Sequence, residues 1–215
     1  MEPIIRENIS AIFALIGVIA GGLLSFLGTW LLKKRELKLR LWEKVLDRRI
    51  EAHEQIAQLS KSLCTMRSLG KPEESGELAR APAFMFSKGH FEEWYKYYSQ
   101  TVGGNSTWLS TELTRELSLL QDYIVNLYEF LRPIDPNLYP EIGALIRNDF
   151  IDFSTRIEKL AFEFFRDDLF KLRLNDLNKW HKYPIEETQR RLSSMRLFSK
   201  NKQIEALIKG NEHES

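Results

Sequence analysis

The first forty residues contain a long apolar run followed by a basic segment. Positions 9–32 read ISAIFALIGVIAGGLLSFLGTWLL, in which every residue is hydrophobic, Gly, Ser or Thr. As a helix this run is about 36 Å long, which is enough to cross a hydrocarbon core about 30 Å thick. The pattern predicts a transmembrane helix over 9–32, preceded by a short tail over 1–8 on the non-cytoplasmic side.

The charges beside this run predict its orientation. Five basic residues follow it, namely Lys33, Lys34, Arg35, Lys38 and Arg40. Cytoplasmic flanks of membrane helices carry an excess of Lys and Arg, and signal peptides carry their charge before the apolar run rather than after it. We therefore expect a single-pass protein of a bacterial inner (plasma) membrane, with its N-terminus outside and the rest of the chain in the cytoplasm. The five basic side chains would contact lipid head groups.

Small residues recur along the apolar run at steps of three and four. The series is Ser10, Ala14, Gly17, Gly21, Ser25 and Gly28, with a GxxxG at its centre. Helices in lipid associate through close backbone approach, which small residues allow. This small-residue stripe predicts packing against a second copy or against the span of a partner membrane protein, and the sequence leaves both open.

Beyond the apolar run, residues 33–69 contain no Gly or Pro, and they predict a juxtamembrane helical stalk. Its apolar residues follow heptad steps: Trp42, Val45, Ala52, Ile56, Leu59, Leu63 and Met66. This seam is typical either of a parallel coiled coil or of a helix that docks onto the helices that follow it.

The remaining chain reads as a linker, a helical domain and a tail. Gly and Pro punctuate 70–86, which we interpret as a linker, and 87–198 holds amphipathic runs typical of a helical bundle. Ser87 is a plausible N-cap for its first helix, and residues 199–215 form a polar tail. No segment alternates with period two long enough to predict a strand. The expected fold is all-α: a transmembrane helix, a stalk and a cytoplasmic bundle.

The charge and cysteine content of the chain disfavour some classes of binding partner. The net charge is +1 and there is one cysteine, so a globally basic nucleic-acid binder and a cysteine-based zinc site are disfavoured. Basic residues gather near the C-terminus at Arg190, Arg191, Arg196, Lys200 and Lys202. They could meet lipid, an acidic protein or nucleic acid. We favour a solvated face that balances the acidic middle of the chain.

The familiar catalytic and metal-binding motifs are missing from the sequence. It contains no phosphate-binding glycine loop, no HExxH and no GxSxG. The histidines, His53, His90, His181 and His213, fall on different expected elements and are interpreted as surface residues. Asp149 and Asp152 share a helical face, which we also interpret as solvated surface. The sequence thus predicts no catalytic, cofactor or metal residue, and no enzyme.

One short pattern points to an alternative. Arg48 and His53 are separated by four residues, a spacing that resembles the active-site pattern of HEPN ribonucleases, which are helical bundles. The resemblance implies acid–base chemistry at an RNA phosphate. The sequence departs from the pattern at Arg49, where such motifs usually place a polar uncharged residue.

These observations favour a non-enzymatic membrane protein. Its cytoplasmic domain would bind a partner, such as a cytoplasmic protein, and would couple that binding to assembly of the membrane helices. One alternative is a membrane-disrupting effector of the toxin or phage-defence type that is activated by clustering. The other is a membrane-anchored, HEPN-like ribonuclease.

Overall fold

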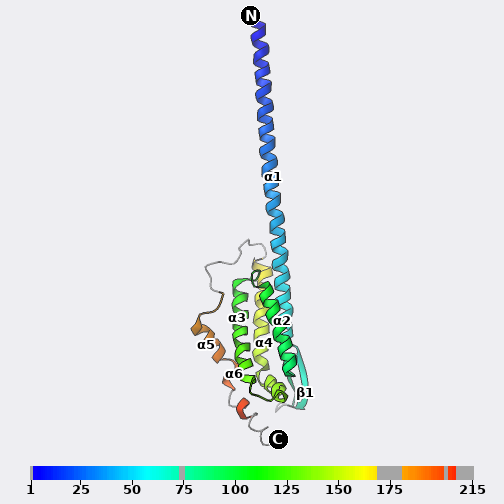
Figure 1. Ribbon diagram of the computed structural model, residues 1–215, viewed down its shortest axis with the longest axis vertical. Coiled ribbons are helices and arrows are strands. Elements are labelled where there is room, and N and C mark those ends of the chain that lie inside the picture. The colour runs from blue at the N-terminus through cyan, green and yellow to red at the C-terminus, as the bar shows by residue number, and fades with distance from the viewer. Residues whose placement is uncertain (1, 73–75, 169–180, 201–202, 207–215) are drawn as a thin grey trace. The chain divides into compact units, whose positions relative to one another are not determined.

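The computed structural model describes residues 2–72, 76–168, 181–200 and 203–206. It divides into two compact units, Met1–Asp47 and Arg48–Ser215, each of which is treated by itself below. Helix α1 (Glu2–Leu63) contributes residues to both units (Figure 1).

The first unit consists of helix α1 up to Asp47. No side chain described between positions 13 and 47 is buried, and the large apolar ones up to Leu41 are exposed. This helix is long and apolar enough to be a candidate membrane span, which confirms the predicted apolar N-terminal helix. Within this helix, Thr29 Oγ1 donates to the Ser25 carbonyl at 2.8 Å. A hydroxyl bonded in this way suits an apolar solvent.

The second unit, called here the body, is mostly helical, as expected. Its elements are β1 (Met66–Pro72), β2 (Leu78–Pro82), η1 (Ala83–Met85), α2 (Lys88–Asn105), α3 (Thr111–Leu131), η2 (Pro136–Leu138), α4 (Tyr139–Glu163), η3 (Phe164–Asp168), α5 (Ile185–Ser193) and α6 (Arg196–Ser199). Ser87 caps α2 as predicted, because its side chain accepts a hydrogen bond from the backbone N–H of His90. Helices α2, α3 and α4 lie side by side (Figure 1).

The hairpin β1–β2 corrects the sequence-based expectation. We predicted helix to residue 69 and a linker without strands over 70–86. Instead α1 ends at Leu63, and the two strands pair antiparallel with Met66 opposite Pro82. The inner strand buries the small residues Ala79 and Ala81. They pack against α4 near Gly143. A Cβ added at Gly143 would lie only 2.8 Å from Met85 Cβ, so this position has no room for a side chain. Tertiary packing therefore overrides local helix propensity.

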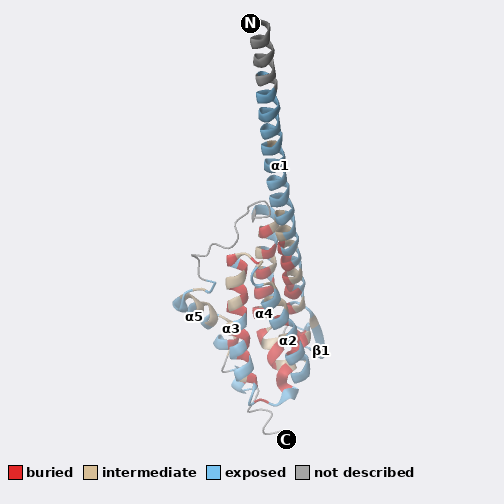
Figure 2. Cartoon of the chain, turned by 45° about the horizontal axis from the view of Figure 1, so that its top comes forward, coloured by how far each residue is buried: buried red, intermediate tan, exposed pale blue. Residues whose placement is uncertain are grey.

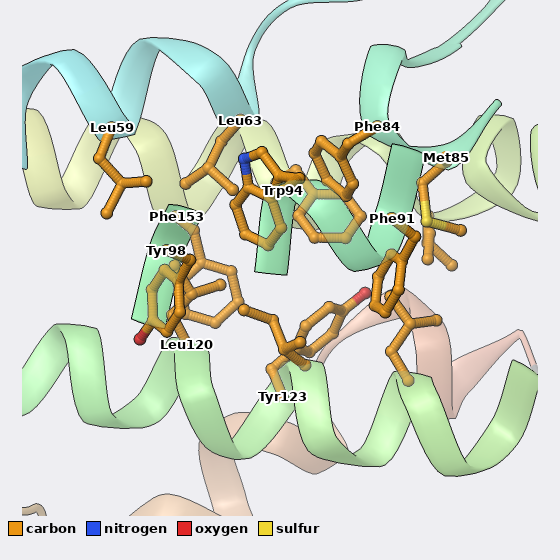
Figure 3. Close-up of a cluster of buried hydrophobic side chains, with 14 of the residues drawn as sticks. Leu59, Leu63, Phe84, Met85, Phe91, Trp94, Tyr98, Leu120, Tyr123 and Phe153 are labelled. Carbon is orange, nitrogen blue, oxygen red and sulfur yellow. The ribbon is translucent and has the colours of Figure 1, made fainter. Parts of the chain in front are cut away.

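One hydrophobic core joins the end of α1 to the other helices of the body (Figures 2 and 3). Leu59 and Leu63 of α1 face Trp94 and Tyr98 of α2 in this cluster (Figure 3). Trp94 Nε1 also donates to Ser62 Oγ at 2.8 Å. The heptad seam from position 52 to 63 is fully buried here. Of the two alternatives for that stretch, the structure shows docking onto the helices that follow.

Candidate functional site

Two buried carboxylates organise the polar side of the body. The first is Glu116 of α3, which is 1% exposed. It accepts hydrogen bonds from Arg156 Nε, from Arg191 Nη1 at 2.8 Å and from the Tyr183 hydroxyl at 3.2 Å. A buried carboxylate is costly unless it is paired in this way. Glu116 therefore ties α3 to α4 and to the region of α5.

The second buried carboxylate is Asp149 of α4, which is 3% exposed. It accepts from the Tyr123 hydroxyl at 3.0 Å and from the backbone N–H groups of Arg196 and Leu197 at 3.0 and 3.1 Å. Arg196 Nη1 lies 3.4 Å from Asp149 and 3.3 Å from Asp152. The expectation that Asp149 is solvated surface is wrong, because the start of α6 covers it. Asp152 does remain exposed.

The two tyrosines at these carboxylates act as neutral donors. Burial raises the pKa of Tyr123 well above its ordinary value, and Asp149 raises it further. Burial also raises the pKa of Tyr183, with Glu116 as the next cause. Each phenol thus stays protonated and donates a hydrogen bond to the carboxylate. A buried carboxylate requires such a donor.

A pocket of about 200 Å³ lies beside these carboxylates. Its wall is polar and draws on α3, α4, α5 and α6, with Leu119, Asp149, Asp152, Arg156, Arg191, Ser194, Met195 and Arg196 as lining residues. We call this cavity the arginine pocket. Its three arginine side chains are between 32% and 39% exposed, so they are held by the body and still reach solvent.

The arginine pocket changes the interpretation of the basic C-terminal residues. Arg191 and Arg196 pair with the buried carboxylates, so the expected solvated basic face is wrong for these two. Arg190 is exposed and Lys200 is partly exposed, while Lys202 lies outside the described residues. Part of the C-terminal charge therefore holds α5 and α6 against α3 and α4.

Arg48 and His53 are not brought together at an accessible site. His53 is fully buried, its ring stacks on Phe164 with centroids 3.6 Å apart, and its Nδ1 lies 2.7 Å from the Arg49 carbonyl. The expectation that His53 is a surface residue is therefore wrong. Arg48 is exposed and pairs with Glu51 at 3.0 Å. A general acid or base must reach its substrate, and this imidazole does not face solvent.

The two other described histidines, His90 and His181, belong to no ligand set. His90 and His181 are exposed, and His213 lies outside the described residues. His90 Nδ1 lies 2.6 Å from Ser87 Oγ, beside the cap of α2. Among the described residues, no three His, Cys, Asp or Glu side chains are grouped as ligands for a metal ion.

The residues predicted to act in the membrane lie on the first unit. Around Gly17, Gly21 and Gly28 a Cβ would meet nothing within 4 Å, while the side chains of Ser10 and Ala14 lie outside the described part. The stripe's packing remains a prediction. All five basic residues that follow the apolar run are exposed, and Lys34 Nζ lies 5.1 Å from the centroid of the Trp30 ring. Their contact with lipid likewise remains a prediction.

A second, apolar groove of about 290 Å³ lies between α2 and α3. Its lining is mostly aromatic and aliphatic: Phe91, Glu92, Tyr95, Ile124, Val125 and Tyr128. Val125 and Tyr128 are both more than two-fifths exposed. A groove of this kind accommodates apolar side chains of a partner.

The site residue that the sequence pattern did not single out is Glu116, the buried partner of Arg156 and Arg191. It lies three residues after Leu113 and four before Leu120, within the apolar face of α3. A lone carboxylate on such a face is the signal of a buried ion pair. Comparison of the chain with protein-family models, with curated proteins and with solved structures finds no match.

Proposed function

We propose that this chain is a non-enzymatic, single-pass membrane protein whose helical bundle lies in the cytoplasm. The bundle binds a partner and couples that binding to association of the membrane helices. The observation that carries the proposal is the division of apolar surface between the two units. Large apolar side chains up to Leu41 are exposed along a helix of spanning length, whereas most of those of the body are buried. Lipid is the solvent that suits the first arrangement.

The charges support the orientation and the membrane contact. Five exposed basic residues follow the apolar run, which favours a cytoplasmic body and anionic lipid at that boundary. Each basic side chain near such a surface contributes about 1 kcal/mol. An inner (plasma) membrane provides both the charge asymmetry and the anionic head groups.

The apolar groove between α2 and α3 supports partner binding. Aromatic residues such as Tyr95 and Tyr128 are common anchors in protein interfaces, because they bury a large area at a small entropic cost. A cytoplasmic protein with an exposed apolar helix face is the class of partner that fits this groove.

The coupling is tested on the full-length protein in nanodiscs. We expect an oligomer whose mass falls to that of the monomer in the double variant Gly17→Leu/Gly21→Leu, because leucines on the stripe prevent close approach. Gly22→Leu is the matched control, since it adds the same side chain next to the stripe and should keep the oligomer. A wild-type monomer, or equal loss in both variants, would contradict assembly through the stripe.

A membrane-disrupting effector is the second candidate. The open surface at Gly17 and Gly21 favours it, because one span per chain can breach a bilayer only when many copies cluster tightly. Overexpression would then stop growth and admit a membrane-impermeant dye, and the double variant would abolish both effects. Harmless overexpression of inserted protein would exclude this candidate. The buried His53 lends no support to an anchored ribonuclease.

A further inference from the structure

Three arginines from three helices surround the arginine pocket and still have N–H donors to spare. Arg156 of α4 uses its Nε on Glu116, which leaves both terminal nitrogens. Arg191 of α5 uses Nη1 and Nε, and Arg196 of α6 uses Nη1. A guanidinium carries five N–H donors. Arg156 and Arg196 thus keep several N–H donors, while Arg191 also interacts with the Tyr183 hydroxyl.

The surrounding side chains fix the three guanidiniums in place. Glu116 holds two of them and Asp149 holds the third. Arg156 also lies over the Phe153 ring at 4.8 Å, and Arg191 lies over the Tyr183 ring at 4.2 Å. Donors that are already ordered bind a ligand with little further loss of conformational entropy.

The positions of the charged side chains in the arginine pocket favour an anion with several oxygens. Glu116 is not among the lining residues, and the side chains of Glu116 and Asp149 are only 2% exposed, so the three arginines and the exposed Asp152 supply most of the accessible charge of the wall. A carboxylate ligand has two oxygens in one plane, whereas a phosphoryl group has three terminal oxygens that point in different directions. Arginines from three separate helices match the second arrangement.

We propose that the arginine pocket binds a phosphoryl group on a small ligand. The cavity of about 200 Å³ is large enough for the phosphoryl group and a short attached fragment. Arg156, Arg191 and Arg196 donate to its oxygens. The ligand contacts α4, α5 and α6 together, so its binding adds to the bonds that hold the C-terminal helices on the body. The pocket lies wholly within the body, and the proposal does not depend on how the membrane helices assemble.

An acidic residue in the pocket, Asp152, allows a test in which the direction of the change in ligand affinity is informative. Asp152 lines the pocket, its side chain is 57% exposed, and it pairs with Arg196 Nη1 at 3.3 Å. Its negative charge repels the ligand. Asp152→Asn removes both this repulsion and the exposed pair with Arg196, and it leaves the buried partners Glu116 and Asp149 unchanged. If the three arginines only hold the fold together, this variant gains no affinity for anything.

The experiment is calorimetric titration of the full-length protein in a neutral detergent. Inorganic phosphate and glycerol 3-phosphate are the phosphoryl probes, and acetate is the carboxylate comparator. We expect saturable phosphate binding with a Kd of about 1 mM or tighter and none with acetate. Asp152→Asn should tighten phosphate binding by about tenfold, the effect of removing one nearby charge at intermediate dielectric. Arg156→Lys should weaken it by about tenfold, because lysine lacks the planar fork.

A control variant and a competition experiment in nanodiscs complete the design. Glu129→Gln removes an exposed carboxylate of α3 outside the pocket and should leave phosphate binding unchanged. A phosphate group can also arrive as a lipid head group, so nanodiscs with and without phosphatidic acid distinguish the two sources by competition with glycerol 3-phosphate. No phosphate binding in folded wild type and in Asp152→Asn would overturn the proposal. Equal responses of Asp152→Asn and Glu129→Gln would overturn it as well.

Discussion

The two units of this chain place apolar and charged groups in opposite ways. Along the first unit, large residues such as Val18 and Leu24 are exposed while no described side chain is buried. In the body the apolar residues form the core, and the carboxylates Glu116 and Asp149 are buried beside it. The comparison teaches that each unit is built for its own surroundings, because exposed apolar area is costly in water and buried charge must be paired.

The units also differ in the range of their side-chain bonds. In the first unit the bonds join neighbouring turns, as in the pair between Arg40 and Glu36. In the body they join distant segments: Ser154 Oγ donates to the Ser60 carbonyl, and Arg191 reaches Glu116. A single substitution should therefore act locally in the first unit and on the whole fold in the body. Four predictions test this contrast.

The largest effect is expected from the buried carboxylate of α3. Glu116→Ala leaves Arg156 and Arg191 without their shared acceptor and should lower the free energy of unfolding by about 3 kcal/mol. Denaturant unfolding monitored by tryptophan fluorescence measures the change. Glu129→Ala, an exposed carboxylate of the same helix, should stay within about 0.5 kcal/mol of wild type. Equal losses in both variants would mean that Glu116 is not a special anchor.

The next effect concerns close packing against the hairpin. Gly143→Ala places a Cβ 2.8 Å from Met85 Cβ and 3.3 Å from Ala81 Cβ, so it should destabilise the body by about 1–3 kcal/mol. Gly103→Ala, in α2 with open space around the new methyl, should stabilise by about 0.5–1 kcal/mol. Thermal unfolding compares the two. A stable Gly143→Ala protein would contradict the tight docking of β2 on α4.

A third effect depends on pH. Burial raises the pKa of Tyr98 and Tyr123 far above the ordinary 10.0, so both stay protonated in the folded body while they ionise in the unfolded chain. Their contribution to stability is complete below pH 10 and is lost as pH rises further. The free energy of unfolding should fall by about 1.4 kcal/mol per pH unit for each tyrosine. The double variant Tyr98→Phe/Tyr123→Phe should show a shallower decline between pH 10 and 11.5, and an unchanged slope would contradict this.

The smallest effect is expected in the first unit. Glu36→Ala removes an exposed pair with Arg40 and should change helix stability by about 0.3–0.5 kcal/mol. It should not shift the denaturant midpoint of the body. Circular dichroism of a peptide spanning residues 33–47 measures the first quantity, and tryptophan fluorescence of the full chain measures the second. A shift in the denaturant midpoint of the body would contradict the expectation that substitutions in the first unit act only locally.

How far the sequence predicted the fold depends on the range of the contacts involved. The amphipathic runs and the cap at Ser87 predicted a helical body and the start of α2, because helix formation and capping depend on neighbouring residues. The hairpin was missed because its inner strand depends on a glycine about sixty positions later, Gly143. The shared face of Asp149 and Asp152 was visible in the spacing. The burial of Asp149 was not, since Arg196 and Leu197 lie almost fifty residues away.

The residues that form the core determine when, during synthesis of the chain, the body can finish folding. Ala52 and Ile204 belong to one hydrophobic cluster, so the body cannot complete its interior until residue 204 has left the ribosome. At 5–20 residues per second, the interval between these two residues is about 10–30 s. The apolar run over 9–32 emerges well before that, while the body is still open. A nascent chain that stops before Arg191 would expose an unfinished interior to quality-control proteases.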